Sequence, residues 1–183
     1  MQKLPHQKVK NIGVANFDMH NLEILLHDPT TSVVPSINQI ELHPYNPTPR
    51  LVSYCKSAGI QCLAFSPLGS RESPVVHEPL VLDIASRNKK TPQQILLMWG
   101  LQNGWGIVVG SFNPIHIISN SELGSWSLTD RDLQQISSCQ TRLRVYTDLE
   151  RTRLPCRVFF DHDVSPQRNA RLAHPADLVY GQD

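Results

Sequence analysis

The sequence has no long apolar run and no excess of charge of either sign. Its 183 residues include 17 lysines and arginines against 16 aspartates and glutamates, which gives a formal net charge of +1. A helix that spans a bilayer needs about 20 consecutive apolar residues, and nucleic-acid-binding domains usually carry a strongly basic face. Neither a membrane nor a nucleic acid is therefore an expected partner.

Cysteine pairs and targeting signals are also missing. The four cysteines are scattered without a C-x-x-C pair, and residues 1–10 lack the apolar core of a signal peptide. Such cysteines are typical of free thiols in a reducing compartment rather than of disulfides or a metal site. With a hydrophobic content of 40%, the composition predicts a cytoplasmic globular protein with a real core.

The sequence does contain a bounded apolar run from Ser36 to Tyr45, SINQIELHPY. Polar residues are set between its apolar residues Ile37, Ile40 and Leu42, and Pro44 ends it, which is typical of a buried strand followed by a loop. The polar side chains need partners, because an unsatisfied buried polar group costs about 1–3 kcal/mol. Taken alone, the run fits a core strand with structural hydrogen bonds better than it fits a functional site.

Three further segments have the same form, namely Val9–Asn16, Ile60–Ser66 and Gly106–Ser111. Each is a short apolar run that ends in a small polar residue and is followed by a helical pattern. Strand and helix thus alternate four times, which predicts a parallel α/β fold. The residues predicted to begin helices are Asp18, Thr48, Thr91 and Asn113, the last three followed directly by proline.

Four motifs in these segments, NIGVANF, INQIELHPY, AFSPLGS and VVGSFNP, resemble the aldo-keto reductases in order and spacing. The resemblance covers about Val9 to Leu133. It implies a (β/α)8 TIM barrel, of which these units would be the last four. Because a complete barrel takes about 250 residues, we expect a truncated barrel over residues 1–141. The implied activity is the NAD(P)H-dependent reduction of aldehydes and ketones to alcohols.

The resemblance also implies which residues would bind NADP or NAD, although no G-x-G-x-x-G loop occurs. Asn16 and Gln39 match the positions that hold the nicotinamide carboxamide, and amide side chains suit that role because they both donate and accept hydrogen bonds. Phe65 matches the aromatic residue that stacks on the nicotinamide ring, although ordinary strand core would also explain it. The remaining matches are Ser66, Leu68 and Ser70 along the pyrophosphate, Ser111, Phe112 and Asn113 at the adenosine, and Asn120 at the adenine.

Two of these assignments can be judged from the residues alone. The loop from Ser66 to Ser70 also fits a simple proline–glycine turn. By contrast, Asn113 and Pro114 open a helix whose free N–H groups favour an anion. The adenosine end of the predicted site therefore has support beyond the resemblance.

Several positions depart from the family pattern. Ala15 replaces a serine that bonds to the carboxamide, and Ser119 replaces a glutamate. Gly110 and His116 stand where the family commonly carries a lysine and an arginine that clamp the 2′-phosphate of NADPH. We therefore expect weak cofactor binding without a preference for NADPH over NADH.

No catalytic residue can be assigned. The family's catalytic aspartate, tyrosine, lysine and histidine lie on the first four strands of the barrel, and Tyr45, beside His43, matches a structural loop. We expect this chain alone to be inactive. The alternatives are a non-catalytic interaction protein that pairs with itself or with a full-length reductase, and the product of an interrupted gene.

The composition changes after Thr141, where seven of the eleven arginines lie. Residues 142–183 show no helical or strand period, which predicts a poorly ordered tail, or alternatively a partner-binding segment.

An open half-barrel would also have two unpaired strand edges and an uncovered inner face. The residues expected on that face are Ile12, Val14, Ile40 and Leu63. Because unpaired edges and apolar patches favour association, self-association is expected.

Overall fold

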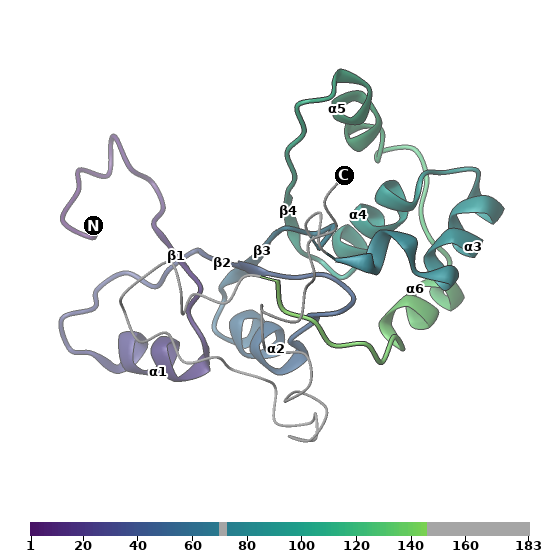
Figure 1. Ribbon diagram of the computed structural model, residues 1–183. Coiled ribbons are helices and arrows are strands. Elements are labelled where there is room, and N and C mark those ends of the chain that lie inside the picture. The colour runs from purple at the N-terminus through teal and green to yellow at the C-terminus, as the bar shows by residue number, and fades with distance from the viewer. Residues whose placement is uncertain (70–72, 146–183) are drawn as a thin grey trace, which may run out of the picture. The chain divides into compact units, whose positions relative to one another are not determined.

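The computed structural model describes residues 1–69 and 73–145. These residues contain a sheet of four parallel strands that neighbour one another in sequence order (Figure 1). The strands are β1 (Gly13–Ala15), β2 (Ile37–Glu41), β3 (Gln61–Phe65) and β4 (Gly106–Val108). The predicted parallel α/β fold is confirmed.

Helices connect every strand to the next, as parallel pairing requires. Helix α1 (Met19–His27) follows β1, and α2 (Pro49–Ser57) follows β2. The 3-10 helix η1 (Pro74–His77), α3 (Pro79–Asn88) and α4 (Pro92–Gln102) lie between β3 and β4, and α5 (Pro114–Ser121) and α6 (Asp130–Ser137) follow β4. Within the described ranges, no helix has both the length and the apolar character needed to cross a bilayer.

All four predicted helix starts are confirmed, since α1, α2, α4 and α5 each begin one residue after the predicted position. The Asp18 carboxylate accepts a hydrogen bond from the Asn21 amide at 2.7 Å, and Thr91 forms a reciprocal capping box with Gln94. The Asn113 side chain caps α5. Thr48 directly precedes α2 as predicted, but it does not cap the helix with its side chain. Its φ of 34° is left-handed, whereas a capping side chain reaches the helix amides from extended backbone.

The sheet has one covered face and one open face. Along β2 and β3, the buried residues Asn38, Ile40, Cys62 and Ala64 alternate with more exposed ones. Figure 1 shows α1 and α2 on the same side of the sheet. The residues of opposite parity form what we call the open face: Gly13, Ala15, Ile37, Gln39, Glu41, Gln61, Leu63, Phe65, Gly106 and Val108.

This register corrects the predicted lining of the inner face. Leu63 does lie on the open face, where it pairs with Gln39. Ile40, one residue beyond Gln39, points to the opposite side and is only 5% exposed. Val14 pairs with Asn38 and lies on the covered face as well. The prediction was wrong for Val14 and Ile40 because the face of a side chain depends on strand register.

The core lies between the covered face and the helices. Trp99 of α4 contacts Trp105 edge to face, with ring centroids 5.0 Å apart. Cys55 of α2 and Cys62 of β3 are both buried free thiols. A hydrogen bond from the Cys62 thiol lowers the pKa of Cys55 to about 7, whereas the same contact and burial raise the pKa of Cys62. The two thiols are therefore direct neighbours.

The described chain continues past the predicted domain boundary at residue 141. The Leu143 amide donates to the Tyr45 carbonyl at 3.0 Å, and the Val145 amide donates to Oε1 of Glu41 at 2.7 Å. Residues 142–145 thus bond to the segment that follows β2. The rest of the predicted tail, residues 146–183, lies outside the described residues.

Candidate functional site

The carboxyl ends of the strands are the natural place for a site, because ligands of parallel α/β sheets bind there. Two residues at these ends have an uncommon backbone. Asn16 directly follows β1 with φ of 58°, and Ser66 directly follows β3 with φ of 48°. Left-handed residues other than glycine are uncommon and often mark functional sites. Both residues belong to the predicted cofactor set.

Asn16 and Gln39 lie side by side, as the resemblance implies. The Asn16 amide donates to the Gln39 carbonyl at 2.9 Å, and Ala15 is the register partner of Gln39. Gln39 lies on the open face, and both residues are half-buried. The chain thus brings the backbone of Asn16, just after β1, next to Gln39 in the middle of β2.

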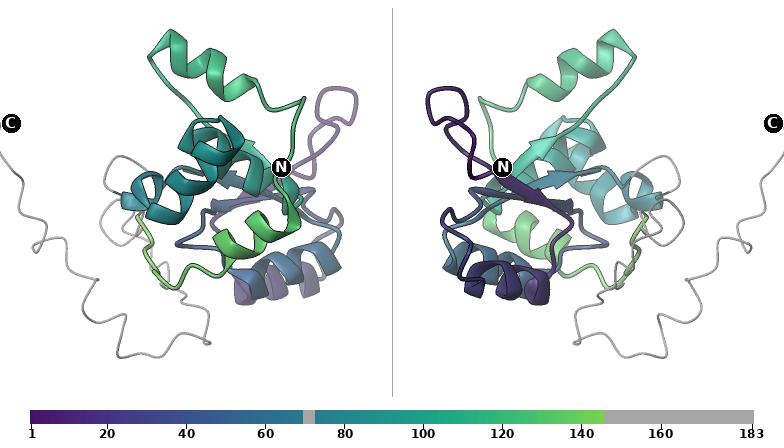
Figure 2. Two further views of the ribbon diagram at one scale, coloured as in Figure 1. Left: turned by 90° about the vertical axis from the view of Figure 1, so that its right-hand side faces the viewer. Right: turned by 90° about the vertical axis from the view of Figure 1, so that its left-hand side faces the viewer.

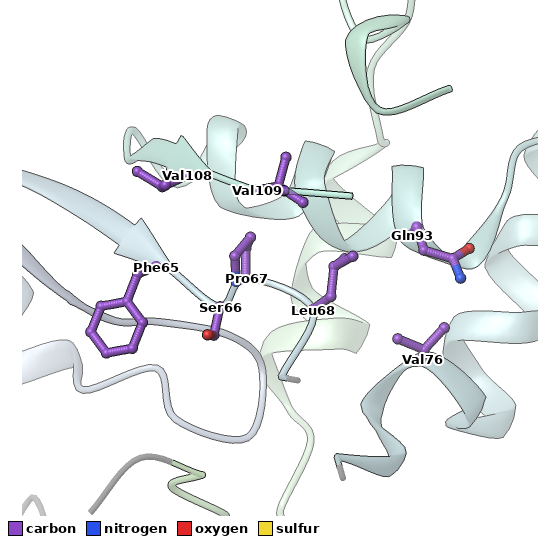
Figure 3. A pocket seen from close by; sticks show the side chains of 9 residues that line it. Phe65, Ser66, Pro67, Leu68, Val76, Gln93, Val108 and Val109 are labelled. Atoms are coloured by element: carbon purple, nitrogen blue, oxygen red, sulfur yellow. The ribbon is translucent and has the colours of Figure 1, made fainter. Parts of the chain in front are cut away.

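A pocket of about 500 Å³ lies beside the carboxyl ends of β3 and β4. This volume falls in the range of about 300–1,000 Å³ that is usual for small-molecule sites. Three predicted residues, Phe65, Ser66 and Leu68, line it. Figure 3 shows Phe65 at one end of the pocket and Val76 with Gln93 at the other.

Sequence reasoning missed several pocket residues. Val76 comes from η1 and Gln93 from the first turn of α4. The Thr91–Pro92 helix start could have pointed to Gln93, because the first turn of a helix presents free N–H groups. No sequence signal singled out Val76. The other lining residues not predicted as cofactor ligands are Pro67, Val108, Val109 and Gly110.

The four predicted adenosine residues do not line this pocket. The chain passes from Gly110 at the pocket wall to Ser111, whose hydroxyl accepts a hydrogen bond from the Asn113 amide at 3.1 Å. Phe112 is fully exposed, and Asn113 is occupied as the cap of α5. Asn120 lies at the far end of α5 and is half-buried. Ser70 lies outside the described residues.

Gly110 and His116, which stand in place of the expected lysine and arginine, both border open space. A side chain added at Gly110 would meet no atom within 4 Å, and His116 lies on the exposed surface of α5. Neither position therefore presents a permanent positive charge beside the pocket. Within the part of the chain that the structure describes, no group of three metal-binding side chains comes together.

The polar residues at the end of β2 are bonded to one another in the interior. His43 is fully buried, and its Nε2 lies 2.9 Å from Oε1 of Glu41, which is also buried. The Tyr45 hydroxyl donates to the Glu78 carboxylate. Burial and this contact raise the pKa of Tyr45, which makes it a poor proton donor. These contacts agree with the structural role predicted for Tyr45 and His43.

Comparisons with known proteins identify the family. Residues 6–71 match the model of the aldo/keto reductase family. Aldehyde reductase YPR1 of Saccharomyces cerevisiae is 38% identical over 75% of this chain and 44% of its own length. Glycerol 2-dehydrogenase (NADP(+)) of the same yeast is 37% identical over the same shares.

The fold gives the same answer. The crystal structure of MGS-M4, an aldo-keto reductase enzyme from a deep-sea metagenome library, superposes with a TM-score of 0.74 and 29% sequence identity. The match covers 79% of this chain and 53% of that structure. The chain thus has the parallel α/β architecture of this class of enzymes. It belongs to the aldo-keto reductase family, and it spans about half the length of the relatives it matches.

Proposed function

We propose that this chain forms the cofactor-binding part of an NAD(P)-dependent oxidoreductase that reduces aldehydes or ketones to alcohols. The observation that supports the proposal is that Asn16, bonded to Gln39, follows the carboxyl end of β1, while the pocket lined by Phe65, Ser66 and Leu68 lies beside the carboxyl ends of β3 and β4. A bound nicotinamide cofactor supplies the hydride for such a reduction.

The residues present fit such a cofactor in part. Amide side chains such as those of Asn16 and Gln39 can orient a carboxamide by donating to its oxygen and accepting from its nitrogen. The half-buried Phe65 ring offers an aromatic face. Pro67 and Leu68 give the adjoining wall of the pocket an apolar surface.

The polypeptide of these 183 residues is proposed to bind either nucleotide weakly and to lack turnover by itself. Gly110 and His116 provide no fixed cation for a 2′-phosphate, and each such charge-assisted bond contributes about 1.5–3 kcal/mol. Tyr45, whose hydroxyl is held by Glu78, has a raised pKa and cannot readily protonate a carbonyl. A cytoplasmic location remains part of the proposal.

Calorimetric titration with NADH and NADPH tests the cofactor role. We expect measurable binding of both, weakened at least about fivefold by Gln39→Leu and by Phe65→Ala, since each change removes about 1 kcal/mol of contact. Gln134→Leu on the exposed side of α6 is the matched control and should bind like the parent chain. Equal binding by all four proteins, or tight binding of NADPH alone, would contradict the proposal.

A second candidate function is a non-catalytic interaction role. It is favoured by the sheet itself, because β1 and β4 each pair with only one strand among the described residues. Unpaired edges are templates for further strands. This role is compatible with cofactor binding. Its partner would be another polypeptide, whereas the partner in cofactor binding is a nucleotide.

A further inference from the structure

Large apolar side chains are exposed mainly along two borders of the sheet. One border is β4 with α5, and the other is β1 with α1 and the start of β2. Of the twelve large apolar residues that are exposed within residues 1–69 and 73–145, eight lie on these borders. They are Val108, Phe112, Ile115, Ile117 and Ile118 on the first border, and Ile24, Val34 and Ile37 on the second.

Helix α5 is the most apolar part of the first border. Its isoleucines Ile115, Ile117 and Ile118 are 73%, 53% and 60% exposed, and it has no buried residue. Figure 2 shows α5 standing apart from the other helices. The stretch 106–121 contains no aspartate, glutamate, lysine or arginine. A helix with this composition and exposure usually packs against another apolar surface.

In a pair of chains, the first border of one copy can pack against the second border of the other copy. All four strands are parallel and run in the order β1-β2-β3-β4. A twofold rotation about an axis parallel to the strands keeps their direction. It therefore places β1 of one copy beside β4 of the other, in the parallel orientation, at two equivalent positions. Eight strands then close on themselves, and no edge remains.

Charge and size agree with this arrangement. The chain carries a net charge of only +1, so two copies repel each other little. Glu41 is the one charged residue among the described strand residues of the open face, and it is buried and already bonded to His43 and to the Val145 amide. One copy corresponds to 53% of the MGS-M4 chain, so two copies supply about as much fold as one complete relative.

We propose that this chain forms a closed symmetric dimer, in which β4 and α5 of each copy pack against β1 and α1 of the other. The open faces of the two sheets then enclose a common interior. The proposal does not depend on cofactor binding, and it is tested without any nucleotide.

Sedimentation of the full 183-residue chain over a dilution series measures the assembly. We expect a discrete dimer whose dissociation constant rises at least tenfold in Ile117→Asp. Leu82→Asp on α3 is the matched control, because Leu82 is 44% exposed and lies away from both borders; it should leave the dimer unchanged. The near-ultraviolet signal of the Trp99–Trp105 pair reports whether each variant keeps its core.

A charge exchange tests which surfaces meet. Ile24→Lys on α1 should weaken the dimer as Ile117→Asp does, and the double variant should recover a substantial part of the loss. Recovery requires α1 to face α5 of the other copy. If the two α5 helices instead met each other, the double variant would be no better than Ile117→Asp.

Other outcomes overturn the proposal. A compact monomer at micromolar concentration would mean that another segment of the chain covers the borders. A ladder of larger species would mean that the strands add without closing. A dimer that resists Ile117→Asp but dissociates in Leu82→Asp would place the interface elsewhere.

Discussion

The backbone of Ser66 has a measurable consequence at the scale of single residues. Its φ of 48° suits glycine better than a side chain branched at Cβ. We expect Ser66→Val to destabilise the fold by about 1–2 kcal/mol, and Ser66→Gly to change stability by less than about 1 kcal/mol. Urea unfolding followed by tryptophan fluorescence measures both.

The control for Ser66 is Ser86→Val, an equal change at an exposed position within α3. Because serine and valine have similar helix propensities, it should cost only a few tenths of a kcal/mol, roughly. If Ser66→Val proved as mild as Ser86→Val, the left-handed turn would not be a constraint on the site.

Gly110 allows the nucleotide preference to be changed at one position. Open space surrounds the point where its Cβ would be, so Gly110→Lys should fold normally and place a cation beside the pocket. We expect it to strengthen binding of NADPH relative to NADH about tenfold or more, since a charge-assisted bond contributes about 1.5–3 kcal/mol. Titration of both nucleotides measures the ratio.

Gly124→Lys is the control for this gain, because Gly124 is also surrounded by open space and lies beyond the end of α5. A general effect of added positive charge would appear in both variants. If Gly124→Lys changed the ratio of NADPH to NADH affinity as much as Gly110→Lys, residue 110 would not lie beside the 2′-phosphate.

At the scale of secondary structure elements, Asp132 joins α6 to α3. It is 2% exposed; its Oδ2 accepts from the Thr129 hydroxyl at 2.8 Å, and its Oδ1 lies 3.1 Å from the Arg87 guanidinium. Burial opposes ionisation, but the Thr129 bonds and the Arg87 charge outweigh it and lower the pKa of Asp132. The ionised form is therefore favoured by folding.

Asp132→Asn should destabilise the chain by about 1–3 kcal/mol at neutral pH. A carboxyl with a lowered pKa contributes its stability above the ordinary value of about 3.9 and loses it as the pH falls through the folded-state pKa. The gap between the two proteins should therefore narrow below about pH 4. Urea unfolding at several pH values measures the gap; a constant gap would exclude an ionic contribution.

The sequence predicted the elements better than their mutual placement. Short apolar runs and capping residues such as Asp18 and Thr91 act locally, so the order of strands and helices could be predicted. The face on which Ile40 lies depends on pairing with β3, which no local pattern reveals. The site divides in the same way: Phe65 and Leu68 are in a recognisable motif, whereas Val76 and Gln93 reach the pocket through tertiary packing.

At the scale of the whole molecule, we expect the polypeptide of 183 residues to reduce no aldehyde or ketone with NADH or NADPH. The physical reason is that Tyr45, held by Glu78, is a weak acid. Absorbance at the nicotinamide band measures the rate, with a buffer blank as the control. Turnover above the blank that disappeared in Tyr45→Phe would show that Tyr45 is the proton donor after all.

The alkylation rate of the neighbouring thiols of Cys55 and Cys62 reports how often the core opens. Both are shielded from solvent, whereas Cys139 is partly accessible, so among the three cysteines that the structure describes an alkylating reagent should modify Cys139 first. Modification of the buried pair has to wait until α2 separates from β3. Its rate, divided by that of the unfolded chain, therefore gives the population of this opened state. A ligand or a second copy that stabilises the sheet against opening would lower the alkylation rate of both thiols without contacting either sulfur.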